Sequence, residues 1–194
     1  MRQTQRIVKA DFLRKAACGF LCLLGVLFSA GMACGAAVSE TELKAAFLYN
    51  FAKFVEWPAE AFSSETTPIQ IAVFGEDEFT VKLRSLLSDK KAHGRSFEVK
   101  RISSSQEAKN CQIVFISNSE SRRVPQLLDA TRKSPVLTIG ETDQFLDAGG
   151  MINFVFEDTQ LRFEVNPEAA ERVKLSISSK LLRLAKRVKK GAKE

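Results

Sequence analysis

The sequence contains one histidine, His93, which is the side chain type whose ordinary pKa lies closest to neutral pH. His93 is followed by Gly94, and this pair indicates a loop that precedes a strand. Nucleophilic catalysis needs a positioned nucleophile, a base and an orienting carboxylate. No G-x-S-x-G sequence is present to hold a serine in that role. We therefore expect His93 to be a loop residue or a ligand contact, and we expect no enzymatic activity.

Metal ions and nucleotide cofactors also lack their usual ligand patterns. The sequence has no C-x-x-C, no H-E-x-x-H and no acidic calcium loop. No glycine-rich phosphate loop follows the first strand predicted below. The carboxylate cluster at residues 76–78 opens a predicted helix, where acidic residues favour the positive end of the dipole. We expect neither a metal nor an organic cofactor.

The four cysteines do not form a disulfide framework. Cys18 and Cys22 lie in an apolar N-terminal run, and Cys34 follows that run. Only Cys111 belongs to the region that is predicted to fold. It is a candidate redox residue with two interpretations: a buried, inert thiol in a strand, or an intermolecular disulfide.

The first 36 residues have the pattern of a secretory signal peptide. Basic residues precede an uncharged apolar run, residues 16–30, and small residues follow it. The run is shorter than the roughly 20 residues that a membrane-spanning helix needs, which disfavours an uncleaved anchor. A lipoprotein form through Cys34 is an alternative, but Gly31 stands where such signals favour a large aliphatic residue. We expect export and cleavage to leave a single domain, residues 37–194.

The formal net charge of +6 is distributed unevenly along the chain. Residues 1–36 hold five basic residues and one acidic residue, and residues 180–194 hold seven basic residues and one acidic residue. The body between them, residues 37–179, is acidic, with 17 basic and 21 acidic residues. An exported, acidic body does not fit a nucleic-acid partner. The basic end is either a solvated helix end or a contact with anionic lipid or an acidic partner.

Strand patterns alternate with helical patterns through most of the chain, which predicts an α/β fold with a mostly parallel sheet covered by helices. A capping box of Ser39 and Glu42 opens a helix over residues 39–57, and Pro58 ends it. Short apolar runs then predict strands at 69–74, 96–102, 112–116 and 136–139. Amphipathic runs between them predict helices at 78–87 and 122–132.

The pattern changes after residue 150. Two alternating segments, 151–156 and 161–165, predict an antiparallel hairpin at a sheet edge. Asn166 then caps, and Pro167 begins, a predicted long terminal helix with an apolar stripe from Ile177 to Val188.

Ligands of open parallel sheets favour the crevice at the carboxyl ends of the strands. Short polar and glycine-containing segments follow the predicted strands at that edge. The candidate ligand contacts are Arg95, Ser117, Asn118, Gly140 and Glu141. This expectation depends on analogy with the fold class alone.

The first predicted helix is apolar on most of its sides, so it is either buried in its own domain or in contact with a partner. Large aromatic side chains commonly anchor protein interfaces. The candidate partner contacts are therefore the aromatic residues of this segment: Phe47, Phe51, Phe54 and Trp57. Burial in the core would exclude them from this role.

The segment from Lys44 to Pro58, KAAFLYNFAKFVEWP, resembles the opening helix of the YfiR family of periplasmic proteins. Further similar segments follow in the same order at 94–95, 111–116, 137–140, 149–154, 161–166 and 177–185. The resemblance covers essentially the whole chain after residue 36. It implies an α/β fold and location in the periplasm.

The resemblance also implies a function. A member of this family represses an inner-membrane diguanylate cyclase by binding its periplasmic sensor domain, which lowers cyclic di-GMP and restrains biofilm formation. The family resemblance further implies a homodimer. Cys111 matches a family cysteine, but the chain after residue 36 has no second cysteine for an intramolecular redox switch. The alternative function is a periplasmic small-molecule binding module.

Overall fold

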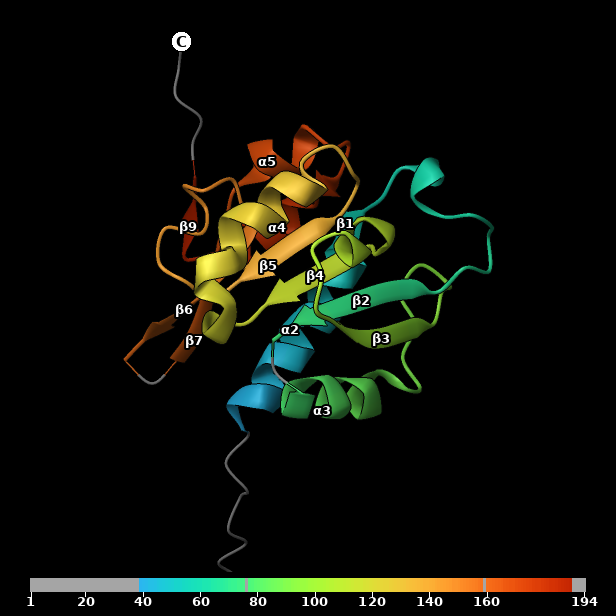
Figure 1. The fold of residues 1–194 in the computed structure, drawn as a ribbon, viewed down its shortest axis with the longest axis horizontal. Helices are drawn as coiled ribbons and strands as arrows, with labels where there is room; N and C mark the ends of the chain where they lie inside the picture. The colour runs from blue at the N-terminus through green and yellow to red at the C-terminus, as the bar shows by residue number, and fades with distance from the viewer. Residues whose placement is uncertain (1–38, 76, 159, 190–194) are drawn as a thin grey trace, which may run out of the picture. The chain divides into compact units, whose positions relative to one another are not determined.

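The computed structural model describes residues 39–75, 77–158 and 160–189 of the chain. Within them, a seven-stranded sheet has the strand order β3-β2-β4-β5-β6-β7-β9 (Figure 1). A separate two-stranded sheet pairs β1 with β8. The predicted signal peptide and residues 190–194 of the basic end lie outside the described residues.

The main sheet is parallel from β3 to β6, and β7 runs antiparallel to β6. Its strands are β2 (Ile69–Phe74), β3 (Phe97–Ile102), β4 (Ile113–Ile116), β5 (Leu137–Gly140), β6 (Ile152–Glu157), β7 (Gln160–Val165) and β9 (Arg187–Val188). The mostly parallel sheet and the antiparallel hairpin are therefore confirmed. The predicted position of the hairpin at the sheet edge is wrong, because the short strand β9 pairs in parallel with the end of β7 and forms that edge instead.

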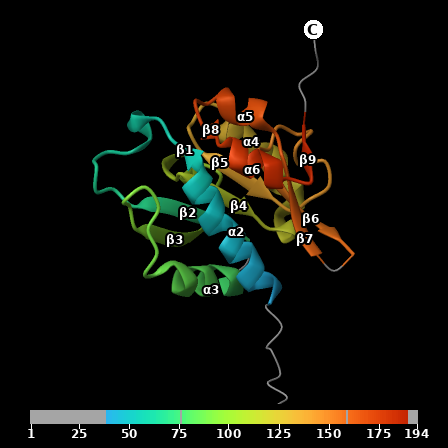
Figure 2. The ribbon, with the colours of Figure 1, turned by 180° about the vertical axis from the view of Figure 1, so that it is seen from behind.

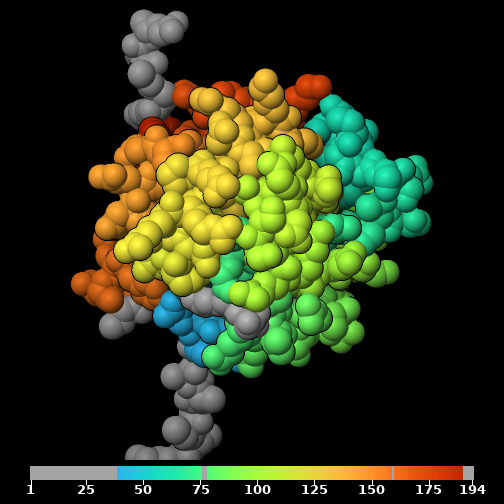
Figure 3. Space-filling view, viewed as in Figure 1, coloured from blue at the N-terminus to red at the C-terminus, as the bar shows by residue number. Residues whose placement is uncertain are grey.

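Helices cover both faces of this sheet. They are α2 (Glu40–Phe54), α3 (Asp77–Leu87), α4 (Val124–Thr131), α5 (Pro167–Glu171) and α6 (Ser179–Leu184), with short 3-10 segments η1 (Ala59–Ala61), η2 (Glu107–Asn110) and η3 (Asn118–Arg123). Figure 1 shows α4 in front of the sheet, and Figure 2 shows α2 across the opposite face. The space-filling view shows α4, in yellow, on the surface of the first face (Figure 3).

The alternation of side chains along each strand divides the core between these two layers. On β2, Ile71 and Val73 join the cluster beneath α2 and α3, whereas Ala72 and Phe74 join the cluster beneath α4. The central strand β4 is buried along its whole length. A strand covered on both faces explains the continuous apolar run that predicted it.

Helix α2 begins at the predicted capping box. The Ser39 hydroxyl accepts a hydrogen bond from the Glu42 amide at 3.2 Å, and the Glu42 carboxylate accepts one from the Ser39 amide at 3.1 Å. The hydrogen bond from the Ser39 backbone and the nearby Lys82 lower the pKa of Glu42. The helix ends at Phe54, where the backbone becomes extended in β1 (Val55–Glu56) before Pro58.

The predicted long terminal helix is wrong. Asn166 does cap a helix, since its side-chain oxygen accepts a hydrogen bond from the Ala169 amide at 3.2 Å. However, α5 ends at Glu171, and the backbone of Lys174 has a φ of +61°. The chain then forms β8 (Ser176–Ile177), α6 and β9. Pairing with the distant strands β1 and β7 outweighs the helical spacing of the apolar residues.

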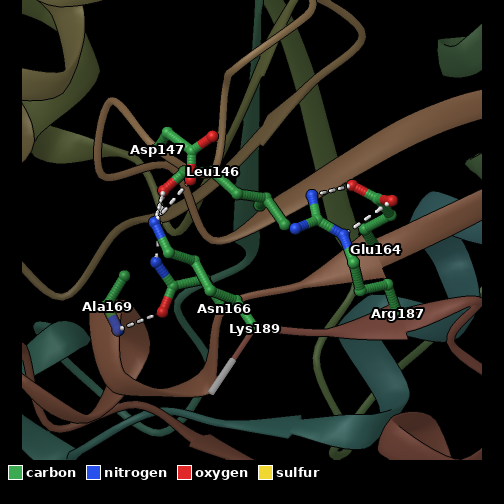
Figure 4. A network of polar contacts seen from close by, with 7 residues as sticks. All are labelled: Leu146, Asp147, Glu164, Asn166, Ala169, Arg187 and Lys189. Carbon is green, nitrogen blue, oxygen red and sulfur yellow. Dashed lines mark hydrogen bonds and ion pairs between the residues drawn. The ribbon is translucent and has the colours of Figure 1, made fainter. Parts of the chain in front are cut away.

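The described part of the basic end is bound to the domain by polar contacts (Figure 4). Lys189 contacts the Asp147 carboxylate at 2.7 Å and donates to the Leu146 carbonyl at 3.2 Å. Arg187 forms a two-pronged contact with Glu164 at 2.9 and 2.6 Å. These two cations are therefore not at a helix end, and both have partners. Arg187 attaches β9 to β7, and Lys189 attaches the residue after β9 to the loop before β6.

The contact between Lys189 and Asp147 has an expected pH dependence. Its hydrogen bond and charge lower the pKa of Asp147. A lowered pKa in the folded state stabilises the protein above the unfolded pKa of about 4, and this contribution is lost as the pH falls through the folded value. We expect Asp147→Asn to unfold at a slightly lower temperature than the wild type at pH 7. The difference should vanish in thermal scans near pH 2, and a difference that persists there would contradict the assignment.

Candidate functional site

A polar pocket lies where β4 and β5 end and continues beside β6. Its volume is about 550 Å³, within the range of small-molecule sites. Helix α2, the segments after β4 and β5, strand β6 and one residue before β9 form its wall: Glu40, Lys44, Asn118, Glu141, Thr142, Asp143, Asn153, Phe154, Val155, Phe156 and Lys186. It is located at the edge of the sheet where the fold class predicts a ligand crevice.

A buried lysine connects three parts of this pocket. The Lys44 ammonium contacts the Glu40 carboxylate at 2.6 Å and the Glu141 carboxylate at 2.5 Å. The other oxygen of Glu141 accepts a hydrogen bond from the backbone amide of Asn118 at 2.9 Å. The first turns of α2 are thereby attached to the segments that follow β4 and β5.

The charge of Lys44 is maintained by its two carboxylate neighbours. Burial by itself lowers the pKa of Lys44, but the hydrogen bonds and charges of Glu141 and Glu40 outweigh burial and raise it. Lys44 is therefore an ammonium ion at neutral pH, although only 8% of the residue is exposed.

Asn153 carries an unsatisfied polar group in the pocket wall. The residue is 5% exposed, and its side-chain oxygen has no hydrogen-bond partner among the described residues. An unsatisfied buried acceptor costs about 1–3 kcal/mol of stability. Sequence reasoning did not select Asn153, Lys44 or Glu40. A usable signal was the polar Asn153 in the apolar run of residues 151–156, because buried polar residues are the informative exceptions.

The structure brings two of the five predicted ligand contacts together, Asn118 and Glu141. Ser117 is fully buried beside them and caps η3, but it does not line the pocket. Gly140 is covered by the ring of Phe145, which a Cβ atom at this position would overlap. The absence of a side chain at Gly140 therefore serves packing.

The fifth predicted ligand contact, Arg95, lies at the opposite end of the sheet, just before β3. Its guanidinium donates to the carbonyls of Ser64 and Thr67 at 2.8 and 2.7 Å. It also stacks on the ring of Phe62, with 3.8 Å from the guanidinium carbon to the ring centre. These contacts hold the loop before β2, so Arg95 is not part of the pocket.

His93 is a loop residue, as predicted, and it has a positive φ of +51°. Its Nε2 atom contacts the carbonyl oxygens of Ala52 and Val55 at 3.0 and 3.1 Å. Because both partners are acceptors, Nε2 carries the proton and donates it. The ring therefore binds one carbonyl in the last turn of α2, where carbonyls lack partners within the helix, and one in β1.

The four candidate partner contacts are buried to different extents. Phe51 is fully buried, so it cannot contact a partner directly in this fold. Phe47, Phe54 and Trp57 are partly buried and pack against the core. The Trp57 indole donates to the Gln112 carbonyl at 3.2 Å. These three residues keep part of their surface exposed.

Other large apolar side chains are more exposed than the predicted ones. They are Leu43, Val81, Phe156 and Leu184, with exposed fractions of 37%, 64%, 53% and 65%. Leu184 ends α6, which contacts α2 and lies beside it in Figure 2. Phe156 lines the polar pocket.

Cys111 has the environment of an inert thiol. The residue is 2% exposed, and its sulfur contacts the Glu107 carbonyl at 3.5 Å. Burial raises the pKa of Cys111 despite the nearby Lys100, so little thiolate is present at neutral pH.

We expect Cys111 in the native protein to react with 5,5′-dithiobis(2-nitrobenzoate) at least about 100-fold more slowly than in urea, because the thiol must first be exposed by opening of the fold. The absorbance of the released thiolate measures the rate. Cys111→Ser supplies the blank. A reaction as fast in the native as in the unfolded protein would contradict the buried thiol and favour the intermolecular disulfide.

No helix among the described residues combines the length and the hydropathy that spanning a membrane requires. The same residues contain no group of three or more histidine, cysteine, aspartate or glutamate residues that could hold a metal ion.

The model of the YfiR/HmsC-like family matches residues 41–186. None of the curated proteins matches the chain. A solved conserved domain protein from Vibrio cholerae O1 biovar El Tor is 14% identical, with a TM-score of 0.52, and the match covers 78% of this chain and 60% of that one. The ABC domain solved in complex with L-Trp from Streptococcus pneumoniae is 11% identical, with a TM-score of 0.46 and coverages of 62% and 55%. The Vibrio match shows similarity of fold alone.

Proposed function

Because the chain belongs to the YfiR/HmsC-like family, whose members are periplasmic regulators of cyclic di-GMP signalling, we propose that it represses a membrane-bound diguanylate cyclase. The family match carries this proposal. It extends from the first turn of α2 to the residue before β9, and therefore includes nearly the whole described domain. The repressor acts after export directed by residues 1–36, binds the periplasmic sensor domain of the cyclase and thereby restrains biofilm formation.

Repression requires a difference in affinity between two states of the cyclase. A regulator that binds the active and inactive arrangements equally well shifts no equilibrium. To change the ratio of active to inactive cyclase from 99:1 to 1:99, the repressor must bind the inactive arrangement about 10⁴-fold more tightly. Such selectivity requires a surface with large, well-packed side chains.

The exposed parts of α2, Trp57 and α6 supply the proposed contact surface. Phe47, Phe54 and Trp57 contribute aromatic area, and Leu184 adds an exposed aliphatic side chain on the neighbouring helix. Phe51 supports this surface from beneath, since it packs on Phe47 with 5.9 Å between ring centres. We further propose that the repressor is a homodimer, which light scattering after size-exclusion chromatography tests directly.

Cellular cyclic di-GMP tests the proposed function. We would measure it in the wild type, in a deletion strain, and in deletion strains complemented with the full chain or with a chain lacking residues 1–36. Deletion should raise cyclic di-GMP, and only the full chain should reverse the rise. No rise under several growth conditions would overturn the proposal.

A matched pair of variants tests the contact surface. Leu184→Asp and Val81→Asp change side chains of nearly equal exposure, 65% and 64%, on α6 and α3. Both proteins should fold, because exposed substitutions typically change stability by less than about 0.5 kcal/mol. We expect Leu184→Asp to lose repression and Val81→Asp to retain it. Equal repression by both variants would exclude Leu184 from the contact.

A further inference from the structure

We propose that the polar pocket between α2, the end of β5 and strand β6 binds a small molecule that carries an ammonium group on an apolar body. None of the side chains in the proposed cyclase contact, Phe47, Phe54, Trp57 and Leu184, lines this pocket. The inference does not require repression of a cyclase, since it follows from the composition of the pocket itself.

The unsatisfied oxygen of Asn153 indicates that the ligand is a hydrogen-bond donor. Native proteins rarely leave a buried polar atom without a partner, and exceptions often mark functional sites. The side-chain torsion that turns an asparagine amide has a broad energy profile, so a small rotation presents the oxygen to a bound donor. An ammonium group satisfies this acceptor and retains further hydrogens for neighbouring carboxylates.

The charges of the pocket favour a cation over an anion. The wall carries the carboxylates of Glu40, Glu141 and Asp143. Lys44 is neutralised by the first two, and Lys186 is paired with Glu157 at 3.2 Å. An anion would therefore meet two engaged cations and an excess of carboxylate.

The exposed carboxylate of Asp143 is the strongest candidate to contact the ligand cation. It lines the pocket and has no ion pair among the described residues. A ligand ammonium would thus lie between Asp143 and Asn153 without breaking the contacts of Lys44.

One aromatic side chain in the pocket wall offers a packing surface for the apolar body of the ligand. Phe156 lines the pocket and is 53% exposed, unlike the buried Phe154 two residues earlier on β6. An aromatic face attracts both apolar groups and cations. The volume of about 550 Å³ accommodates a small aromatic or aliphatic amine.

The test compares three probes that differ in one polar group: 2-phenylethylammonium, 2-phenylethanol and 3-phenylpropionate. Each is titrated into the exported protein, produced from the full chain, while backbone amide resonances are recorded by NMR. We expect saturable shifts at Asn118, Asp143 and Asn153 with the ammonium, at least about tenfold tighter than with the alcohol, and none with the carboxylate. Absent saturation, equal binding of the carboxylate, or shifts confined to another pocket would overturn the proposal.

A pair of asparagine variants links binding to the unsatisfied oxygen. Asn153→Leu removes the amide at nearly constant volume, and Asn110→Leu makes the same change at an exposed position outside the pocket. We expect only Asn153→Leu to weaken ammonium binding, by about tenfold or more. Its melting temperature should equal or exceed that of the wild type, because the buried unsatisfied group is gone. Unchanged affinity would overturn the role of Asn153.

A second variant keeps the proposal testable if Asn153→Leu does not fold. Asp143→Asn changes an exposed side chain, so the fold should be retained. It should weaken binding of 2-phenylethylammonium several-fold and leave binding of 2-phenylethanol unchanged, since only the cation loses its countercharge. Equal loss for both probes would contradict the proposed charge selection.

Discussion

Replacing Phe51 with alanine is expected to lower the free energy of unfolding by about 3–5 kcal/mol. The ring is fully buried between α2 and the sheet. It lies 5.7 Å from the ring of Phe154 and 5.1 Å from that of Phe163, measured between ring centres. Truncation removes buried apolar area and leaves a cavity that the surrounding strands cannot close. Urea denaturation at 25 °C, followed by circular dichroism, measures the loss.

Phe54→Ala is the matched control, because Phe54 is in the same helix but only partly buried. It should cost clearly less stability than Phe51→Ala. A loss below about 1 kcal/mol for Phe51→Ala would contradict the buried packing described here. Since small domains are stable by only about 5–15 kcal/mol, Phe51→Ala should also reduce the amount of protein in cells.

Phe51→Leu separates packing from partner contact. This substitution keeps most of the apolar volume, so the protein should fold and still lower cyclic di-GMP. A variant that folds but no longer represses would indicate that Phe51 contacts the cyclase after rearrangement. In that case, the burial of Phe51 would describe only the free protein.

Lys44→Met is expected to cost about 3–5 kcal/mol, the usual penalty for removing one member of a buried ion pair. The side chain of Lys44 is 10% exposed and that of Glu141 is 9% exposed. Without the ammonium, the Glu141 carboxylate stays buried with the backbone amide of Asn118 as its hydrogen-bond donor. Guanidinium denaturation of the variant and the wild type measures the difference.

The double variant Lys44→Met, Glu141→Leu is the control for this interpretation. Replacing a buried ion pair by apolar side chains of similar volume is often neutral, so the double variant should recover most of the lost stability. If it is no more stable than Lys44→Met, the loss arises from packing of the lysine stem and not from the charge left behind.

The ion pair should also respond to alkaline pH. The pKa of Lys44 is raised in the folded protein, so its contribution is complete below the unfolded lysine value of about 10.4. The contribution is lost as the pH rises through the raised folded value. Relative to the double variant, the wild type should therefore lose stability only above about pH 10. A shift between pH 7 and 9 would implicate another group.

Much of the architecture follows from local patterns. The strand predicted at 69–74 coincides with β2, and the capping box at Ser39 marks the start of α2. Both signals depend on a few neighbouring residues: an apolar run between turn residues, and a hydroxyl three residues before a glutamate. The prediction failed after Glu171, where β8 and β9 pair with strands more than 20 residues away. Such pairing leaves no local period in the sequence.

The candidate site likewise contains residues that local sequence patterns predicted and residues that only the fold brought together. The sequence alone determined that polar residues follow β4 and β5, and because parallel strands end at one edge, Asn118 and Glu141 could be expected together. Only the tertiary structure brought Lys44 from α2 and Asn153 from β6 to that edge. The sequence also determined that the first helix is apolar on most sides. The tertiary structure decided that Phe51 is buried while Phe54 and Trp57 keep exposed area, because burial depends on which distant strands cover each side of the helix.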